Sequence, residues 1–377
     1  MKNDSLMSTV DFRFPAFDDG WEGRLWQGQW LGQHWLDLFG DSGAASLGAR
    51  SQQHVDLYSE MKVSNTHVPS VHGTSDREAV TAKLCEMTGQ DKAFWCTSGA
   101  EAVEAAIKIA RKHSAPGRYK IASFFGDFHG RTYGAMSASF GPSYHRDGYQ
   151  PLAPGFYSFE HLEDIDWKTT AGVIICPMFC DHDFREHPHG FLENLENACK
   201  WNGIPLIFDE VQTGSGRTGA MTYGQLVNVK PDILCLAKGI GMGVPVGITL
   251  AQEPYADVFR PGTHFSTFGG NSLQVKAVRT YLDWMNTGGL AIVQAASEIW
   301  RAGLRDIFDH DPRGRGLCMA VDVESNEDFL AAATEQRLVM GIFKKGAGGV
   351  RITPALNMSM LDIQEALERL AKAKSAC

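Results

Sequence analysis

The sequence lacks any hydrophobic run long enough to cross a membrane, because no stretch of about 18 apolar residues occurs. The N-terminal segment also lacks an apolar signal region. Positive charge is not in excess: the formal net charge is -9, which argues against a general affinity for nucleic-acid phosphates or anionic membranes. We therefore expect a cytoplasmic protein whose partners are small molecules.

Paired C-x-x-C motifs are absent, although the chain has eight cysteines. Cys176 and Cys180 form a lone C-x3-C, and His182, His187 and His189 follow closely. Structural zinc ligands normally come as paired clusters on tight turns, whereas Cys176 closes an apolar strand pattern. We predict no metal site here and interpret most of the cysteines as reduced, buried residues.

The chain has 377 residues, which exceeds the size of one small core and favours two domains. Short apolar runs alternate with helical patterns, as in YKIASFF, AGVIICP, IPLIFDE, DILCLA and VGITLAQ. Such alternation is typical of an α/β fold with a mostly parallel sheet covered on both faces. We predict a large domain over residues 66–290. Residues 1–65 and 291–377 are expected to form a smaller α+β domain from both chain ends.

The segment PLIFDEVQTGSGRTG, residues 205–219, poses the main functional question. An ATPase interpretation would need a phosphate loop of the form G-x4-G-K-[ST], and the chain has no Gly-Lys pair. The Gly214-x-Gly216-x-x-Gly219 pattern matches a dinucleotide loop, but it lies in mid-domain without a clear helix start or following acid. A clamp for pyridoxal phosphate remains as the third interpretation.

That cofactor needs a lysine for a Schiff base, a carboxylate for the ring nitrogen and an anion site for the phosphate. Asp209 ends one apolar run and Lys238 ends another. Val211 is suited to lie flat on a ring, and Gln212 can reach a phenolic oxygen. The small-residue turn 97–100, with Ser98, precedes a strong helix pattern and offers backbone N–H groups to a phosphate.

Each of these residues also has a purely structural interpretation. Ser98 is suited to cap a helix, Asp209 to occupy a turn, and Lys238 to lie on the surface near a helix end. Their joint occurrence at strand ends, in a workable order, favours the cofactor site.

Six segments resemble the class III aminotransferases of the ornithine, acetylornithine and GABA type. They are TSGAEAVEAAIKIAR, FHGRT, IFDEVQTGSGRTG, KPDILCLAKGIGMGVPVG, HFSTFGGN and VRITPAL. The resemblance runs from about Trp35 to the last helix pattern. It implies a fold-type I pyridoxal phosphate enzyme and a homodimer with the active site at the subunit interface.

The resemblance implies a set of cofactor-binding residues: Ser98, Gly99, Ala100, Phe128, His129, Asp209, Val211, Gln212, Lys238 and Thr267. Lys238 and Asp209 would be catalytic, as the Schiff-base lysine that shuttles protons and as the partner of the ring nitrogen. Phe128 and Val211 would lie on opposite faces of the ring. Thr267 would reach the phosphate of the neighbouring subunit's cofactor.

Arg131 and Arg351 match two family arginines that receive substrate carboxylates. In much of the family a strand-end glutamate masks the deeper arginine, which corresponds to Arg351. Cys176 stands where we expect this glutamate, in the segment CPMFCDHD. We hypothesise that Arg351 either stays available for a carboxylate or pairs with another group, such as a nearby aspartate.

The implied reaction is a ping-pong transfer of an amino group from an amine or amino acid to a keto or aldehyde acceptor, with glutamate and 2-oxoglutarate as the expected couple. An aminomutase or a racemase would use the same clamp without an external acceptor. The Trp-rich segment from Trp21 to Trp35 and the altered CPMFC strand favour a specialised biosynthetic substrate, which leaves the glutamate partner open as well.

Overall fold

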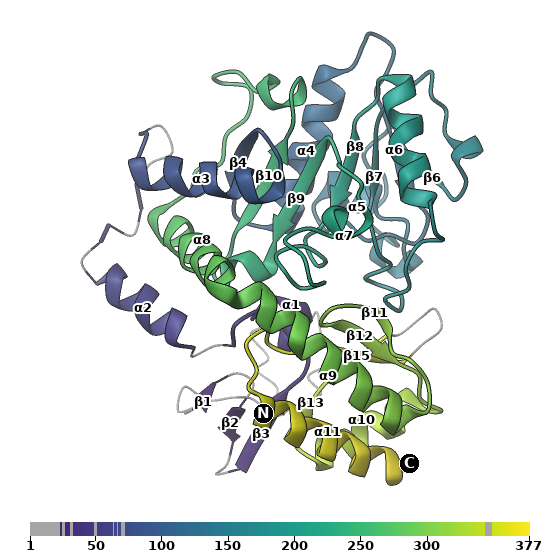
Figure 1. The fold of residues 1–377 in the computed structure, drawn as a ribbon. Helices are drawn as coiled ribbons and strands as arrows, with labels where there is room; N and C mark the ends of the chain where they lie inside the picture. Colours follow the sequence, from purple (N-terminus) through teal and green to yellow (C-terminus); the bar gives the residue numbers. More distant parts are fainter. Residues whose placement is uncertain are drawn as a thin grey trace.

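The computed structural model describes residues 23–24, 27–30, 33–48, 51–62, 64–65, 67–68, 72–343 and 349–377. A large sheet with its helices fills the upper part of the molecule, and a smaller sheet lies below it (Figure 1). Trp21 and Trp26, which contributed to the predicted Trp-rich segment, lie outside the described residues.

The large sheet has seven strands, and β10 runs antiparallel to both of its neighbours. The neighbouring pairs among the other strands, from β9 to β6, are parallel. In spatial order the strands are β4 (Lys92–Cys96), β10 (Gly247–Ala251), β9 (Ile233–Ala237), β8 (Leu206–Asp209), β7 (Thr170–Ile175), β5 (Lys120–Phe124) and β6 (Phe156–Phe159). The prediction of a mostly parallel α/β sheet is confirmed.

The five predicted apolar runs are the five inner strands of this sheet. The sequence did not single out β4 and β6, which form its two edges. Both edge strands are only partly buried, so they lack the continuous apolar character that marks the inner strands.

Successive residues of the inner strands enter two separate cores. In β8, Ile207 packs in the core on the α4 side, while Leu206 and Phe208 pack in the core on the other side. The helices of this part are α3 (Ser75–Thr88), α4 (Gly99–His113), α5 (Tyr133–Ala138), α6 (Phe191–Asn202), α7 (Tyr223–Val227) and α8 (Ser272–Trp284). The sheet is therefore covered on both faces, as predicted.

The lower part contains segments from both ends of the chain. Its sheet is antiparallel, in the order β11 (Arg313–Arg315), β12 (Cys318–Val321), β15 (Val350–Ile352) and β14 (Gly341–Ile342). Its helices are α9 (Leu290–Phe308), α10 (Asn326–Glu335) and α11 (Met360–Ser375). A further sheet joins β1 (Gly23–Arg24), β2 (Gln27–Trp30) and β3 (Gln33–Asp37) to β13 (Leu338–Val339), which runs parallel to β3.

Between the two sheets the N-terminal segment also forms α1 (Gly40–Gly43) and α2 (Gln52–Met61). The sequence did not single out α2. It is a half-exposed helix whose buried residues are only His54 and Leu57, so its apolar periodicity is weak.

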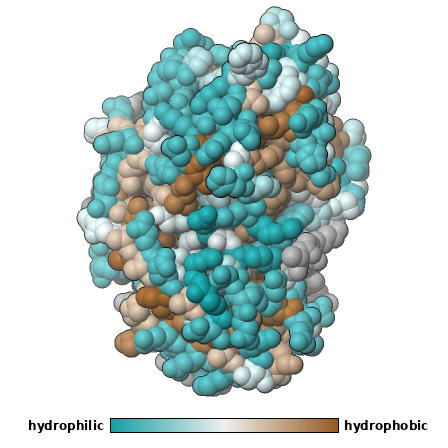
Figure 2. All heavy atoms as spheres, turned by 45° about the vertical axis from the view of Figure 1, so that its right-hand side comes forward, coloured by the Kyte–Doolittle hydropathy of each residue, from teal (hydrophilic) through white to brown (hydrophobic). Residues whose placement is uncertain are grey.

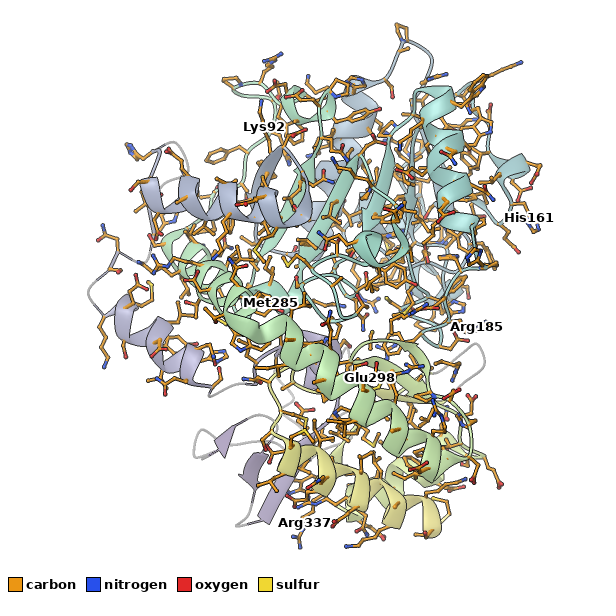
Figure 3. All side chains as sticks on the ribbon, in the orientation of Figure 1. Lys92, His161, Arg185, Met285, Glu298 and Arg337 are labelled. Atoms are coloured by element: carbon orange, nitrogen blue, oxygen red, sulfur yellow. The ribbon has the colours of Figure 1, made fainter. Side chains whose placement is uncertain are left out.

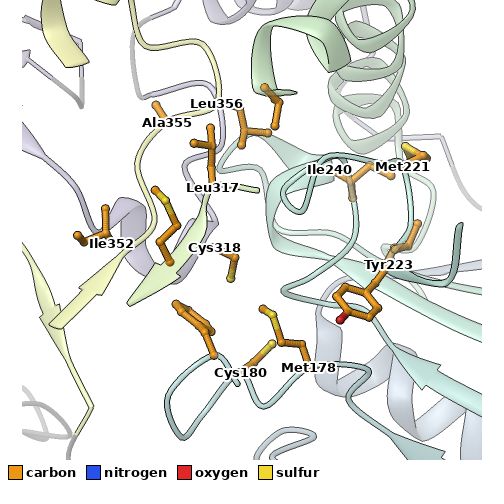
Figure 4. Close-up of a cluster of buried hydrophobic side chains, with 14 of the residues drawn as sticks. Met178, Cys180, Met221, Tyr223, Ile240, Leu317, Cys318, Ile352, Ala355 and Leu356 are labelled. Atoms are coloured by element: carbon orange, nitrogen blue, oxygen red, sulfur yellow. The ribbon is translucent and has the colours of Figure 1, made fainter. Parts of the chain in front are cut away.

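Two features join the upper and lower parts. Helices α8 and α9 form one long run across the molecule, with buried Met285 where they meet (Figures 1 and 3). The labelled charged residue Arg337 lies at the far end of the lower part (Figure 3). One hydrophobic core also continues between the parts: Met178 and Cys180, which follow β7, face Cys318 of β12 (Figure 4).

On the face shown in Figure 2, hydrophobic residues form separate patches in a mostly hydrophilic surface. Among the residues that the structure describes, no helix combines the length and apolar character needed to cross a membrane.

Candidate active site

A pocket of about 690 Å³ lies at the carboxyl ends of the parallel strands, where the upper and lower parts meet. Open α/β sheets bind their ligands at this edge. Eleven of the twelve residues predicted for the site line it: Ser98, Gly99, Ala100, Phe128, His129, Arg131, Asp209, Val211, Gln212, Lys238 and Arg351. Thr267 does not line it and is exposed on a loop.

Lys238 follows the last residue of β9 and adopts a left-handed backbone conformation, with φ of 47°. Its Nζ donates to Oε1 of Gln212 over 3.4 Å. Burial lowers the pKa of the Lys238 amine from its usual value, because the dry site disfavours the ammonium form. The amine is therefore more easily available as an uncharged nucleophile and base than a surface lysine.

Asp209 is the last residue of β8 and is buried. Its Oδ2 lies 2.8 Å from Nδ1 of His129, and its Oδ1 accepts the backbone N–H of Val211 over 3.1 Å. Because a buried carboxylate is costly without partners, these contacts favour an ionised Asp209 that faces the pocket.

The N-terminus of α4 begins at the pocket. Ser98 is its N-cap and accepts the N–H of Glu101, so the structural interpretation of Ser98 is correct. The two interpretations do not compete, because the first amide groups of a helix have no partner within it and point at the space in front of it. Gly99 packs so closely there that a Cβ would lie 2.8 Å from a methyl carbon of Val211.

Two flat or branched side chains border the same space. Phe128 lies beside the pocket, with the Arg131 guanidinium 5.2 Å from its ring centre and the His145 ring 4.9 Å away. Val211 also lines the pocket and packs against Gly99. The side chains of Phe128 and Val211 therefore border a slot into which an aromatic ring can fit.

Glu210 points away from this slot. Its carboxylate accepts the N–H groups of Tyr223 and Gly224, and burial raises its pKa to about 7. Its carboxylate therefore holds the start of α7 in place. The following glycines form turns, with positive φ at Gly216 and Gly219.

Arg351 extends from β15 of the lower sheet into the pocket. Its Nη2 donates to the carbonyl of Cys180 over 3.3 Å, and its Nη1 lies 3.5 Å from the hydroxyl of Ser42. Its Nε is buried and has no hydrogen-bond partner within the described part of the chain. Burial lowers the pKa of the guanidinium, while the nearby Asp181 carboxylate offsets part of that effect.

Cys176, at the position where a glutamate was expected, does not contact Arg351. The side chain of Cys176 contacts the Phe128 carbonyl and the His129 ring, not Arg351. The acidic group that acts on Arg351 is Asp181, five residues further along. Asp181 acts on Arg351 by charge, without an ion pair between them among the described residues, and its ion-pair contact is with His145. Both halves of the hypothesis therefore stay predictions.

Several lining residues were not predicted, among them Asp41, Ser42 and Asp181. Asp127, directly before Phe128, lies behind the pocket: its Oδ2 accepts the backbone N–H of Cys176 over 2.7 Å. The only sequence signal for Asp127 was its place after the β5 run. Asp127, His129 and Cys176 each bring one possible ligand atom within 4.8 Å of the others. Burial raises the pKa of the Asp127 carboxyl and of the Cys176 thiol, which disfavours the anionic forms that bind a metal, and we assign no metal site to them.

The family model for class III aminotransferases matches residues 24–373. The chain belongs to the class III aminotransferases. It is 37% identical over 320 residues to the acetylornithine aminotransferase of Aquifex aeolicus, covering 82% of this chain and 84% of the relative. It is 36% identical over 381 residues to that of Methanopyrus kandleri, covering 97% and 95%.

The fold agrees with this membership. The ornithine aminotransferase of Toxoplasma gondii, a structure described as having partial occupancy of PLP at its active site, superimposes with a TM-score of 0.85 at 25% identity. The match covers 94% of this chain and 89% of that one. The chain is therefore a fold-type I, pyridoxal phosphate-dependent aminotransferase.

The pocket fits that cofactor on its own geometry. Nε2 of Gln212 is buried and has no hydrogen-bond partner within the described residues, although its Oε1 accepts from Lys238. A buried amide with a missing partner is costly and is explained by a ligand oxygen at that point. The tight packing of Gly99 against Val211 provides the flat wall that a ring requires.

Proposed function

We propose that this aminotransferase takes its amino group from a donor of the acetylornithine type and uses the glutamate and 2-oxoglutarate couple. The observation that carries the proposal is the pair of guanidinium groups, Arg131 and Arg351, in the same pocket as Lys238. A dicarboxylate such as 2-oxoglutarate can place one carboxylate on each arginine, and such charge-assisted contacts are strong and directional. The names of the relatives support the same donor class.

In this proposal the cofactor is held at four points. Its phosphate lies at the N-terminus of α4, beside Ser98, Gly99 and Ala100. Phe128 and Val211 hold the two ring faces, which is supported by the fact that both side chains line the pocket. Gln212 binds the ring hydroxyl through its unpartnered Nε2.

Asp209 pairs with the ring nitrogen, and His129 supports it from behind. When bound, pyridoxal phosphate supplies an electron-withdrawing ring that takes up the charge left at the substrate carbon. Nζ of Lys238 accepts the proton from the amine-bearing carbon of the substrate and returns it at the end of the transfer. Its lowered pKa keeps the uncharged amine populated closer to neutral pH.

Asp181 gives Arg351 two working states. With a dicarboxylate bound, the guanidinium binds the second carboxylate through two nitrogens. These are Nη1, whose contact with Ser42 is long, and Nε, which has no partner within the described residues. With an uncharged donor end, such as an acylated amine, Asp181 balances the guanidinium charge. A single pocket can thus accept both substrates of a ping-pong reaction.

The proposal includes a homodimer in which Thr267 reaches the phosphate of the neighbouring subunit's cofactor. Thr267 lies outside its own pocket and is exposed, between the exposed aromatic side chains of Phe265 and Phe268. Exposed aromatic clusters of this kind favour a protein interface. A cytoplasmic setting belongs to the same proposal, supported by eight cysteines without a disulfide.

An amine panel with 2-oxoglutarate or pyruvate as acceptor tests the reaction. We expect acetylornithine-type donors to react with 2-oxoglutarate in strong preference to pyruvate. Conversion of an amine without any acceptor would instead identify an aminomutase or a racemase. Transfer from other amines, with acetylornithine-type donors inert, would identify a specialised biosynthetic enzyme.

A further inference from the structure

Behind the proposed cofactor ring, three side chains form a buried line. His129 stands between two carboxyl groups: its Nδ1 lies 2.8 Å from Oδ2 of Asp209, and its Nε2 lies 3.9 Å from Oδ2 of Asp127. The side chains of His129 and Asp127 are 0% and 1% exposed, so both lie in the buried interior of the protein. Asp209 ends β8, and both Asp209 and His129 line the pocket, whereas Asp127 does not.

The outer end of this line is unsatisfied. Nε2 of His129 has no hydrogen-bond partner within the described residues, and Asp127 is its nearest acidic group. Because Asp209 is engaged as an acceptor at Nδ1, the proton of a neutral His129 sits on Nδ1 and leaves Nε2 as a bare acceptor. A bare, buried acceptor beside a carboxyl group is the arrangement in which a proton can be shared.

Asp127 is suited to supply that proton. Burial raises the pKa of its carboxyl well above the usual value, and the nearby Asp209 adds to the effect, although the Cys176 N–H opposes it. Further titratable groups around the line are Cys176, Cys180 and Cys235, and burial raises the pKa of all three thiols. Lys238 and Glu210 also interact with Asp209 by charge. Asp181 also acts on Asp127 by charge repulsion.

We propose that Asp127 is a positioning residue that shares one proton with Nε2 of His129 and thereby sets the charge of the imidazole that faces Asp209. In one state the proton is on the Asp127 carboxyl and His129 is neutral. In the other state the O–H bond is broken, the N–H bond is formed, and a cationic His129 lies between two carboxylates. No proton enters or leaves, and Nδ1 keeps its proton toward Asp209 in both states.

The separation of 3.9 Å is longer than a hydrogen bond of about 3 Å, so transfer requires one side chain to move by about 1 Å. Hydrogen bonds in ligand-free sites are often long and shorten when the ligand binds. The role of the shared proton toward the ring nitrogen rests on the proposed role of Asp209. The protonation of Nε2 of His129 can be measured without any turnover, so it does not depend on that role.

The test is NMR of the holoenzyme with histidine rings labelled with ¹⁵N, and the His129 signal assigned by its loss in His129→Asn. In the wild type we expect Nε2 to show partial protonation around neutral pH. In Asp127→Asn the amide keeps the shape and still accepts the Cys176 N–H, but it cannot carry a negative charge. We expect this variant to abolish the partial protonation of Nε2 around neutral pH, because the carboxyl group that shares its proton is gone.

The matched control is Cys176→Ser, which changes a neighbour of the same ring without changing its charge and keeps the backbone N–H to Asp127. We expect the His129 titration to stay within a few tenths of a unit in this control. The visible absorption of the bound cofactor should change its pH dependence in Asp127→Asn but not in Cys176→Ser.

Two results would overturn the proposal. One is a bare Nε2 with a purely neutral ring across the neutral pH range in the wild type, a measurement that does not depend on any variant folding. The other is an unchanged His129 titration in folded Asp127→Asn, which would reduce Asp127 to an acceptor for the Cys176 N–H. Loss of transamination with the shared proton intact would instead count against the proposed function.

Discussion

Replacing Arg351 by methionine tests whether its guanidinium binds the second carboxylate of the acceptor. Methionine keeps an unbranched side chain of similar reach against Phe343 and Phe184, whose ring centres lie 4.3 and 5.4 Å from the guanidinium carbon. The existing hydrogen bonds of Arg351 are long, at 3.3 and 3.5 Å, and Nε has none within the described residues. Little of the fold therefore depends on the guanidinium.

The magnitude follows from the bond that is lost. A hydrogen bond to a charged group contributes about 1.5–3 kcal/mol, and a bidentate contact in a dry pocket reaches the upper end. A loss of about 3 kcal/mol lowers kcat/KM for 2-oxoglutarate by roughly 150-fold. Pyruvate, which has one carboxylate, should lose much less, so the preference for 2-oxoglutarate should collapse.

Steady-state kinetics measure kcat/KM for 2-oxoglutarate and for pyruvate, each compared between the variant and the wild type. The matched control is Arg305→Met on α9, because Arg305 is exposed, pairs with exposed Asp311 and lies outside the pocket. We expect wild-type kinetics from the control. If Arg351→Met keeps the wild-type preference for 2-oxoglutarate over pyruvate, the guanidinium does not bind the acceptor and the proposed couple fails.

Three further variants follow from the same geometry. Lys238→Ala should remove transamination and the long-wavelength absorption of the cofactor, while melting of the protein stays cooperative; spectra and thermal denaturation check this. Glu210→Gln should make stability less dependent on pH. The wild type, whose Glu210 pKa is raised from 4.5 to about 7, loses stability on the order of 3 kcal/mol as the pH rises through that interval, because the folded state binds the extra proton; denaturant titrations at several pH values measure it. Gly99→Ala should weaken cofactor binding at least about tenfold, because its Cβ would lie 2.8 Å from Val211 and push the ring wall aside; fluorescence titration of the cofactor-free enzyme measures the affinity.

The sequence predicted those parts of the fold whose signal is local. The inner strands are continuous apolar runs because both faces are buried, and this is visible without coordinates. The edge strands β4 and β6 and the half-exposed helix α2 have no such signal, since their burial depends on where the sheet ends. The boundaries of the predicted domains stay a prediction.

The residues of the candidate site likewise fall into those that the sequence predicted and those that it did not. Asp209 and Lys238 end apolar runs, so their place at one sheet edge followed from the pattern. Asp127 and Asp181 became visible only when β5 and β7 lay side by side, because neither has a motif of its own. The roles of the site residues, including Thr267, remain predictions.

The order of the strands explains why this edge needs a ligand. Along the neighbouring parallel strands, Lys238 directly follows β9, Asp209 ends β8, Cys176 directly follows β7, and Asp127 is the third residue after β5. Buried charges of this kind cost stability unless they are paired, and Lys238 has no carboxylate within ion-pair distance among the described residues.

A cofactor that binds this edge should therefore stabilise the fold as well as enable the reaction. At a free concentration about 100 times the dissociation constant, binding adds about 2.7 kcal/mol to the free energy of unfolding. Thermal denaturation of the cofactor-free enzyme with added pyridoxal phosphate should show a higher Tm, and Lys238→Ala should retain only part of that rise. Pyridoxal without the phosphate is the matched control, because it cannot use the N-terminus of α4. An equal rise with pyridoxal would show that the helix N-terminus does not hold the phosphate, and it would remove the anchor from which the orientation of the ring between Phe128 and Val211 is argued.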